Sequence, residues 1–214
     1  YRQDFNIDPL RFWRENDEED RQGITEIRYV TGYLAFWDDL LRAYPGMLID
    51  SCASGGRRND LETLRRAVPL LRSDFRFNSL GNQCHTYGIA TWMPFYGTNF
   101  RAAAAYDVRS AMCPSLGARL DVRDRDFDYE TVRHLVAEWR QLAKYYRGDF
   151  CPLTQYSLEE DAWMAWQFHR PDLREGVLQA FRRPESREAS LRLHPRYLDP
   201  ETRYVLRNAD VSET

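Results

Sequence analysis

Apolar and polar residues along the first two thirds of the chain follow the order expected of strands that alternate with helices. Apolar side chains recur at helical spacing over residues 24–43, and Pro45 and Gly46 end that helix. Residues 47–49 and 68–71 are short, continuous apolar runs, and polar residues follow each of them. Such runs are typical of strands buried on both faces of a parallel sheet. This part of the chain is therefore predicted to consist of βα units.

Helix caps and further apolar segments extend the pattern. Asn59 or Asp60 can cap a helix that continues to residue 67, and Asp128 can cap the helix with the clearest apolar stripe. The other expected elements are, in chain order, a helix over 79–87, strands over 89–93 and within 104–112, and the long helix over 129–147.

The pattern changes after Gly148. Four short β-like segments follow, separated by Pro, Asp and Gly turns, with no helical stripe between them. They cover residues 162–168, 176–181, 189–193 and 203–206. We therefore predict an α/β domain over residues 1–150 and a small antiparallel β domain, a β-sandwich, over residues 151–214.

Periodicity alone leaves two α/β architectures open, a (β/α)8 barrel and a doubly wound sheet. A complete barrel needs roughly 250 residues, so this chain would supply only its C-terminal part. The chain begins at Tyr1, with no initiator Met and no leader segment, which suggests a piece of a longer protein. In a barrel the chemistry lies where the strands end, and Asp4, Asp50, Cys52 and Asp74 follow predicted strands.

Charge and cysteine content narrow the class of protein. Thirty basic and 33 acidic residues give a net charge of −3 without any block of five like charges, so we expect no nucleic-acid or membrane partner. The four cysteines have neither metal-ligand spacing nor a disulfide pattern, which favours a reducing compartment, and we expect a cytoplasmic protein. The sequence offers no metal site and no phosphate-binding motif, and we expect no cofactor.

Asp4 and Asp74 are a candidate pair for glycoside hydrolysis. In that reaction one carboxylate attacks the anomeric carbon, and the other exchanges a proton with the leaving oxygen and with water. Spacing alone is weak support, because a carboxylate at a strand end often caps the next helix. Among other polar residues, Asp50 is expected to be a hydrogen-bonded strand-end residue, Arg72 points to the barrel mouth or to solvent, and His85 is packed or exposed.

Three motifs in order resemble glycoside hydrolase family 36, the retaining α-galactosidases. Residues 2–6 read Arg-Gln-Asp-Phe-Asn and correspond to the family's Lys-Trp-Asp-x-Asn motif. Residues 52–60 answer to its Cys-Ser-Gly-Gly-Gly-Gly-Arg-x-Asp loop, and Ser73 with Asp74 answers to its Ser-Asp pair. Residues 106–112 with 116–121 resemble its last barrel strand. The resemblance implies barrel strands 4–8, without strands 1–3, followed by the C-terminal β domain.

The same resemblance implies roles for individual residues. Asp4 would be the nucleophile and Asp74 the acid/base, while Arg2, Asn6, Cys52 and Gly55 would bind the sugar. Trp92 is a candidate stacking platform because it follows a predicted strand. The substrate would be an α-galactoside oligosaccharide or glycoconjugate, and the longer parent could form a homo-oligomer.

Departures from the family motifs leave the sugar and the acceptor open. Arg2 replaces a Lys, Gln3 replaces a Trp, and Ala53, Ser54 and Arg57 interrupt the glycine loop. Galactose and N-acetylgalactosamine both remain candidates, as do hydrolysis and transglycosylation of the raffinose-synthase kind. An inactive carbohydrate-binding fragment is the third alternative, since the missing strands would leave a barrel edge open and the isolated piece poorly soluble.

Overall fold

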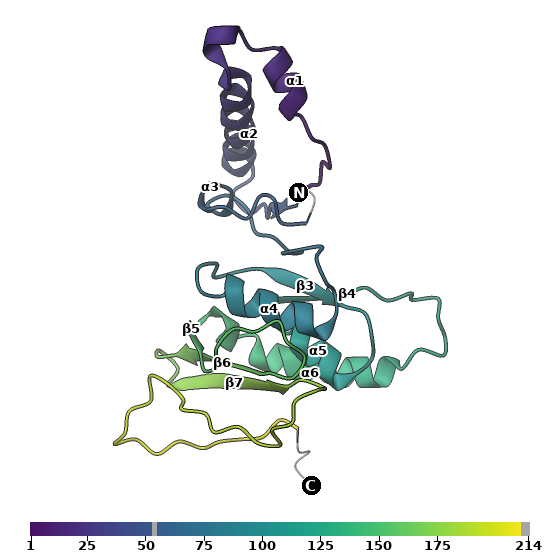
Figure 1. Cartoon of the computed structure of the whole chain (residues 1–214), viewed down its shortest axis with the longest axis vertical. Coiled ribbons are helices and arrows are strands. Elements are labelled where there is room, and N and C mark those ends of the chain that lie inside the picture. The colour runs from purple at the N-terminus through teal and green to yellow at the C-terminus, as the bar shows by residue number, and fades with distance from the viewer. Residues whose placement is uncertain (53–54, 211–214) are drawn as a thin grey trace.

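The computed structural model describes residues 1–52 and 55–210 (Figure 1). Short parallel strands separated by helices form the first part, and an antiparallel sheet forms the last. In the view of Figure 1, the elements α1 (Leu10–Glu15), α2 (Ile24–Ala43) and α3 (Leu61–Leu64) lie at one end of the molecule. The antiparallel sheet lies at the other end.

Parallel strand segments pair in sequence order. β1 (Arg2–Gln3) pairs with β2 (Asp50–Ser51), and Asp50 of β2 forms a parallel bridge with Val68. Gly97 N–H donates to Pro69 O over 2.7 Å, and Gly97 O accepts from Arg72 N–H over 2.9 Å. These bonds join residues 68–72 to β3 (Gly97–Phe100), which in turn pairs with β4 (Ser115–Ala118). Within the described residues the array is open, with β1 and β4 at its two ends.

Helices connect these segments, as the sequence predicts for βα units. α1, the 3-10 turn Glu19–Arg21 and α2 lie between β1 and β2, and α3 follows β2. α4 (Ser79–Ile89), α5 (Ala105–Ala111) and α6 (Tyr129–Leu142) come later, and a further 3-10 turn, Tyr145–Arg147, follows α6. The two predicted caps are confirmed: Asp60 accepts from Thr63 N–H and Asp128 from Thr131 N–H, both over 2.9 Å.

α2 has the bounds that its apolar stripe predicts, and it contributes to a core with the strand segments. Trp37 is fully buried beside Ile49 and Ala67. The Trp37 indole N–H donates to the Gln3 side-chain oxygen over 3.2 Å, which ties α2 to β1. Buried side chains therefore pack α2 against β1 and the segments around β2.

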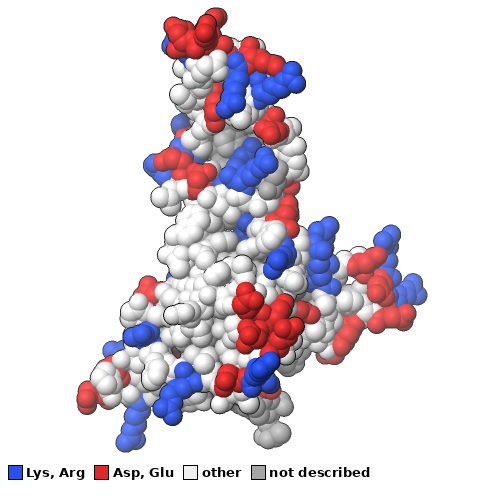
Figure 2. Space-filling model, viewed as in Figure 1, with Lys and Arg blue, Asp and Glu red and all other residues white. Residues whose placement is uncertain are grey.

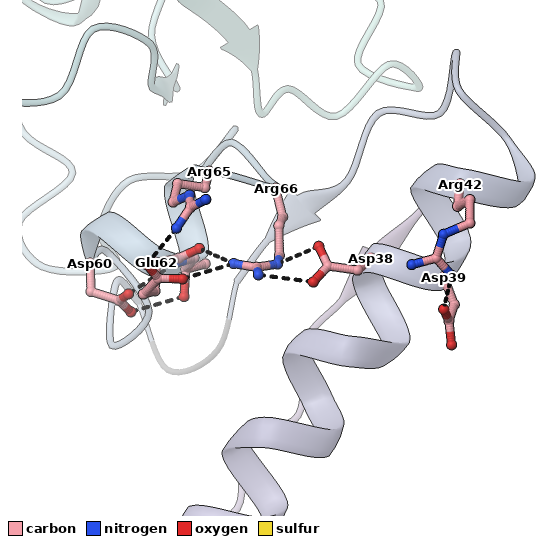
Figure 3. A network of polar contacts seen from close by, with 8 residues as sticks. Asp38, Asp39, Arg42, Asp60, Glu62, Arg65 and Arg66 are labelled. Atoms are coloured by element: carbon pink, nitrogen blue, oxygen red, sulfur yellow. Dashed lines mark hydrogen bonds and ion pairs between the residues drawn. The ribbon is translucent and has the colours of Figure 1, made fainter.

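An arginine joins α3 to α2 (Figure 3). Arg66 donates to both carboxylate oxygens of Asp38, over 2.7 and 2.9 Å, and to Glu62 over 3.0 Å. These hydrogen bonds lower the pKa of Asp38 and raise that of Arg66. A forked guanidinium suits such bidentate pairing, so Arg66 fixes the spacing between the two helices.

The last part of the described chain forms one antiparallel sheet of β5 (Asp149–Pro152), β6 (Trp163–Arg170) and β7 (Glu175–Arg182). One face of β6 packs on α5 and α6 through a buried cluster that includes Trp166, Phe168 and Val108. The antiparallel character predicted for this region is confirmed.

Several predicted elements are wrong in kind. The strand expected within residues 104–112 is instead the helix α5, Ala105–Ala111, in which Val108 N–H donates to Ala104 O over 3.0 Å. Residues 89–93 are the end of α4 and a turn, in which Trp92 N–H and Met93 N–H both donate to Ile89 O. Short apolar runs do not distinguish a strand from a buried helix, and here packing decided for the helix.

Other strands were missed or wrongly expected. β3 was not predicted because its sequence, Gly-Thr-Asn-Phe, has little apolar character. Gly97 is needed there because a Cβ would come within 2.3 Å of Leu70 O on the neighbouring segment. β4 overlaps only the start of residues 116–121. Residues 189–193 and 203–206 form no strand. The intervening Arg196 backbone is held by the Gln167 side chain through two 2.8 Å hydrogen bonds.

Acidic and basic side chains are interspersed on the face shown in Figure 2, and the middle of that face is largely uncharged. In the described part of the chain, no helix combines the length and apolar character needed to cross a bilayer.

Candidate active site

The ends of the parallel segments bring the predicted carboxylates to one edge. Asp4 follows β1, Cys52 follows β2, and Asp74 follows the segment 68–72. Since these segments run parallel, their carboxyl ends share an edge, which is where (β/α) folds place their chemistry.

Arg2 bridges two carboxylates. Its guanidinium donates to Asp4 Oδ2 over 3.0 Å and also to Asp50 Oδ2. Burial lowers the pKa of Arg2, but the hydrogen bonds to Asp50 and Asp4 outweigh it and the pKa is raised. Asp50 is buried, and its other oxygen accepts from Leu70 N–H over 2.9 Å. Asp50 is thus a hydrogen-bonded residue at a strand end, as expected.

Glycine lets the loop after β2 lie directly against Asp74. Gly55 has φ +65°, and a Cβ there would lie 2.6 Å from Asp74 Cβ and 2.7 Å from its backbone nitrogen. Gly56, at φ +103°, lies against Arg72 O, which also accepts from the Asn59 amide over 2.8 Å. Both glycines combine a left-handed backbone with a close approach that a side chain would prevent.

Cys52 lies within the electrostatic reach of both carboxylates. Its side chain is buried, and burial raises the pKa of the thiol, which the Arg2 charge lowers and the Asp4 and Asp74 charges raise further. The structure therefore places Arg2, Asp4, Cys52, Gly55 and Asp74 at the same edge of the parallel array, with Arg2 bonded to Asp4 and Gly55 against Asp74.

Asn6, two residues after Asp4, is exposed on the segment between β1 and α1. One predicted residue stands apart from this group. Trp92 precedes β3 and lies beyond the end of α4, so it belongs to the opposite edge of the parallel array. The reason for choosing Trp92 was wrong, because the strand that it was expected to follow is helix and turn. Ala53 and Ser54 lie outside the described residues.

The sequence suggested Asn59 only as a possible helix cap and left the direction of the Arg72 side chain open. Arg72 is 1% exposed and points neither to solvent nor to an open mouth. It donates to Thr86 Oγ1 and to Asn82 O, both over 2.8 Å, and lies over the Tyr96 ring. His85 is half-buried near this cation. Burial, with a smaller contribution from Arg72, lowers the pKa of His85 to about 4. The contacts of Arg72 with α4 and of Asn59 with Arg72 O join segments that are separate in the sequence, so only the folded structure shows them.

No group of three or more His, Cys, Asp or Glu in the described residues could hold a metal ion. The arrangement offers two carboxylates at a shared edge, one of them held by a cation. This is a donor and acceptor set suited to acid/base and nucleophilic chemistry.

The fold is similar to that of solved α-galactosidases of glycoside hydrolase family 36, so the resemblance seen in the motifs is confirmed in structure. AgaB from Geobacillus stearothermophilus aligns with a TM-score of 0.76 and 24% identity over 93% of this chain. The enzyme from Lactobacillus brevis aligns with a TM-score of 0.71 and 21% identity over 97% of it. The galactosidase domain of the α-galactosidase-sucrose kinase AgaSK aligns with a TM-score of 0.73 and 19% identity over 93% of this chain.

The chain spans only part of these proteins: 29% of AgaB, 28% of the Lactobacillus brevis enzyme and 28% of the AgaSK chain. No protein-family model and no curated protein matches the sequence.

Proposed function

We propose that the chain is the C-terminal part of a retaining glycoside hydrolase that cleaves terminal α-galactosides. Residues 1–150 would supply strands 4–8 of a (β/α)8 barrel, and residues 151–214 the C-terminal β domain, for which the described residues form one antiparallel sheet rather than the expected sandwich. The observation that carries the proposal is that Asp4 follows β1 and Asp74 follows the segment 68–72 of the same parallel array, with Gly55 of the loop after β2 against Asp74. The fold similarity to α-galactosidases supports it.

The reaction would proceed by double displacement. Asp4 attacks the anomeric carbon, while protonated Asp74 gives its proton to the leaving oxygen. The resulting glycosyl ester of Asp4 is hydrolysed by water, from which Asp74, now a carboxylate, takes a proton. Two inversions at the same carbon retain its configuration.

The surrounding residues have supporting roles in this proposal. Arg2 orients Asp4 through its hydrogen bond, and Gly55 lets the loop approach Asp74 closely. Arg2, Asn6, Cys52 and Gly55 would line the galactosyl subsite. A planar, forked guanidinium in place of an ammonium group reshapes the contacts available to a sugar hydroxyl.

Oligosaccharides are the proposed substrate class. Family 36 α-galactosidase AgaA has been solved with raffinose and with stachyose. Transglycosylation to a sugar acceptor uses the same two carboxylates, and product analysis with excess acceptor distinguishes it from hydrolysis. We place the protein in the cytoplasm, because its four cysteines are free. A homo-oligomer of the longer parent stays a prediction.

Azide rescue tests the two assignments in the longer protein that contains these residues. Asp4→Gly should abolish turnover of an aryl α-galactoside, and azide should restore it with formation of the β-galactosyl azide. Asp74→Gly should instead give the α-galactosyl azide, since azide then attacks the glycosyl ester. Asp8→Asn, an exposed carboxylate on the same segment as Asp4, is the matched control and should keep its activity. Full activity of Asp4→Gly without azide would overturn the assignment.

The second candidate is a carbohydrate-binding piece without activity, favoured by the open edge of β1. The 214 residues alone should then bind a galactoside without hydrolysing it and should be poorly soluble. Ordinary turnover by the isolated chain would exclude this candidate.

A further inference from the structure

Asn59 joins the glycine loop after β2 to the segment that carries Asp74. Its side-chain amide donates to Arg72 O over 2.8 Å, and Arg72 lies two residues before Asp74. Asn59 is half-buried, so water competes only in part for this hydrogen bond. In the family motif that residues 52–60 resemble, position 59 is the variable one, and the resemblance therefore implies no role for Asn59.

The residues on either side of Asn59 are themselves held by hydrogen bonds. Before it, Arg58 donates to Cys52 O over 3.1 Å. After it, Asp60 accepts from the backbone N–H and from the hydroxyl of Thr63, both over 2.9 Å, where the loop enters α3 (Figure 3). A donor whose position is already fixed loses little conformational entropy when it forms its hydrogen bond. The Asn59 amide can therefore serve as a fixed point for the neighbouring strand end.

Gly56 leaves room for the contact between Asn59 and Arg72. A Cβ at Gly56 would lie 2.7 Å from Arg72 O and 2.9 Å from the Asn59 amide nitrogen, so the Gly56 backbone lies directly against this hydrogen bond. The backbone N–H of Asn59 also donates to Gly56 O over 3.2 Å, which closes a tight turn. The turn and the amide contact thus form one unit, in which Asn59 holds both Gly56 and Arg72.

The Arg72 backbone is held on its other side as well. Its N–H donates to Gly97 O of β3 over 2.9 Å, and its buried side chain donates to two residues of α4. The carbonyl that Asn59 holds belongs to the peptide group that leads on toward Asp74. The Asp74 side chain is exposed, so it is the backbone of residues 72–74 that places its carboxylate at the edge of the parallel array.

We propose that Asn59 is a positioning residue for Asp74, a role that rests on the proposed function of Asp74 as the acid/base. A general acid has to lie within hydrogen-bond distance of the leaving oxygen, and a displacement of about 1 Å can cost about 100-fold in rate. Without the Asn59 amide the strand end loses its hydrogen bond to the glycine loop, and Asp74 delivers its proton less efficiently. Asn59 acts only through the Arg72 carbonyl and touches no reacting atom.

A displaced acid affects different substrates unequally. Methyl α-galactoside has a basic alkoxide leaving group that needs a proton, whereas 2,4-dinitrophenyl α-galactoside has a phenolate leaving group that departs without one. A change that only destabilises the protein lowers the amount of active enzyme, and therefore affects both substrates by the same factor. The ratio of the two kcat/KM values thus separates a positioning role from a merely structural one.

The experiment measures kcat/KM for both substrates in the longer protein that contains these residues. Asn59→Leu keeps the size of the side chain without a donor, and Asn59→Ala removes the side chain. Both should lower kcat/KM by about 10- to 100-fold for methyl α-galactoside and by less than about 3-fold for the dinitrophenyl substrate. Asn16→Ala is the matched control and should change neither value, because the Asn16 amide also donates to a backbone carbonyl, Phe12 O over 2.7 Å, but at the end of α1. Thermal melts check that all variants are folded.

An equal loss for the two substrates, or no loss for either, would overturn the positioning role. Asp74→Gly is measured beside the Asn59 variants, and its own preference for the dinitrophenyl substrate reports on the proposed function. If Asp74→Gly shows that preference and the Asn59 variants do not, only the positioning role of Asn59 is wrong. If Asp74→Gly shows no preference, the acid/base assignment is wrong and the role of Asn59 is overturned with it.

Discussion

Gly55 and Asp74 are in backbone contact: a Cβ on Gly55 would lie 2.6 Å from Asp74 Cβ and 2.7 Å from Asp74 N. The loop after β2 and the loop that carries the proposed acid/base therefore form one unit. Any side chain at position 55 has to displace Asp74, and the φ of +65° adds strain to the steric conflict. The position of Asp74 depends on a residue 19 positions away that contributes no side chain.

Gly55→Ala should destabilise the chain by about 1–3 kcal/mol, the usual cost of a strained backbone conformation. In the longer protein it should also lower kcat, because Asp74 moves. Urea unfolding and steady-state kinetics measure the two effects. Gly46→Ala is the control, since a Cβ there meets no atom within 4 Å, and its stability should change by less than about 0.5 kcal/mol. Equal stability of the two variants would contradict the packing argument.

The two oxygens of Asp50 can be tested separately. Asp50→Asn keeps an acceptor for Leu70 N–H and loses the ion pair with Arg2, whereas Asp50→Ala loses both. We expect Asp50→Ala to be the less stable variant by about 1–2 kcal/mol, because a backbone donor is left without a partner. Urea unfolding of the two variants gives the difference. If Asp50→Asn and Asp50→Ala unfold at the same urea concentration, the hydrogen bond from Leu70 N–H does not stabilise the strand end.

His85 should make the chain sensitive to acid. Its pKa is lowered to about 4 by burial and by Arg72, below the value of about 6.5 expected in the unfolded chain. The unfolded state therefore binds more protons between these values. The stability contributed by neutral His85 is present above pH 6.5 and is lost as the pH falls through about 4.

His85→Gln should accordingly flatten the fall in Tm between pH 7 and pH 4, and thermal melts at several pH values measure it. Carboxylates contribute to the same fall in every variant, so the comparison is with His134→Gln on the exposed side of α6. The His134 variant should retain the wild-type slope. A wild-type slope in the His85 variant would show that the ring titrates normally.

Arg66→Lys should lower Tm, since an ammonium group cannot reproduce the forked pair with Asp38 shown in Figure 3. Arg66→Ala should lower it further, and a cycle with Asp38→Ala should show coupling between the two residues. Arg42→Ala is the control. Arg42 pairs with Asp39 on the exposed surface of α2, the helix that also carries Asp38, and the Arg42 and Asp39 side chains are 74% and 69% exposed. If Arg42→Ala lowered Tm as much as Arg66→Ala, Arg66 would not be stabilising the contact between α2 and α3.

Local signals predicted the elements that depend on local physics. The apolar stripe located α2 at Ile24–Ala43, and the oxygens of Asp60 and Asp128 marked helix starts, because a cap satisfies a backbone donor only three residues away. The strands predicted at residues 89–93 and within 104–112 were wrong because a short apolar run fits a strand or a buried helix equally well. Packing of Val108 against the antiparallel sheet made the first of these a helix.

By itself, the sequence determined the order of the three motifs, the alternation of βα units and the change to antiparallel structure after Gly148. Only the tertiary structure decided which side chains meet, because parallel pairing joins segments far apart in the chain, such as Arg2 with Asp50. It placed Trp92 at the opposite edge and put Gly55 against Asp74. Such relationships arise from the register between strands and helices, which no short stretch of sequence encodes.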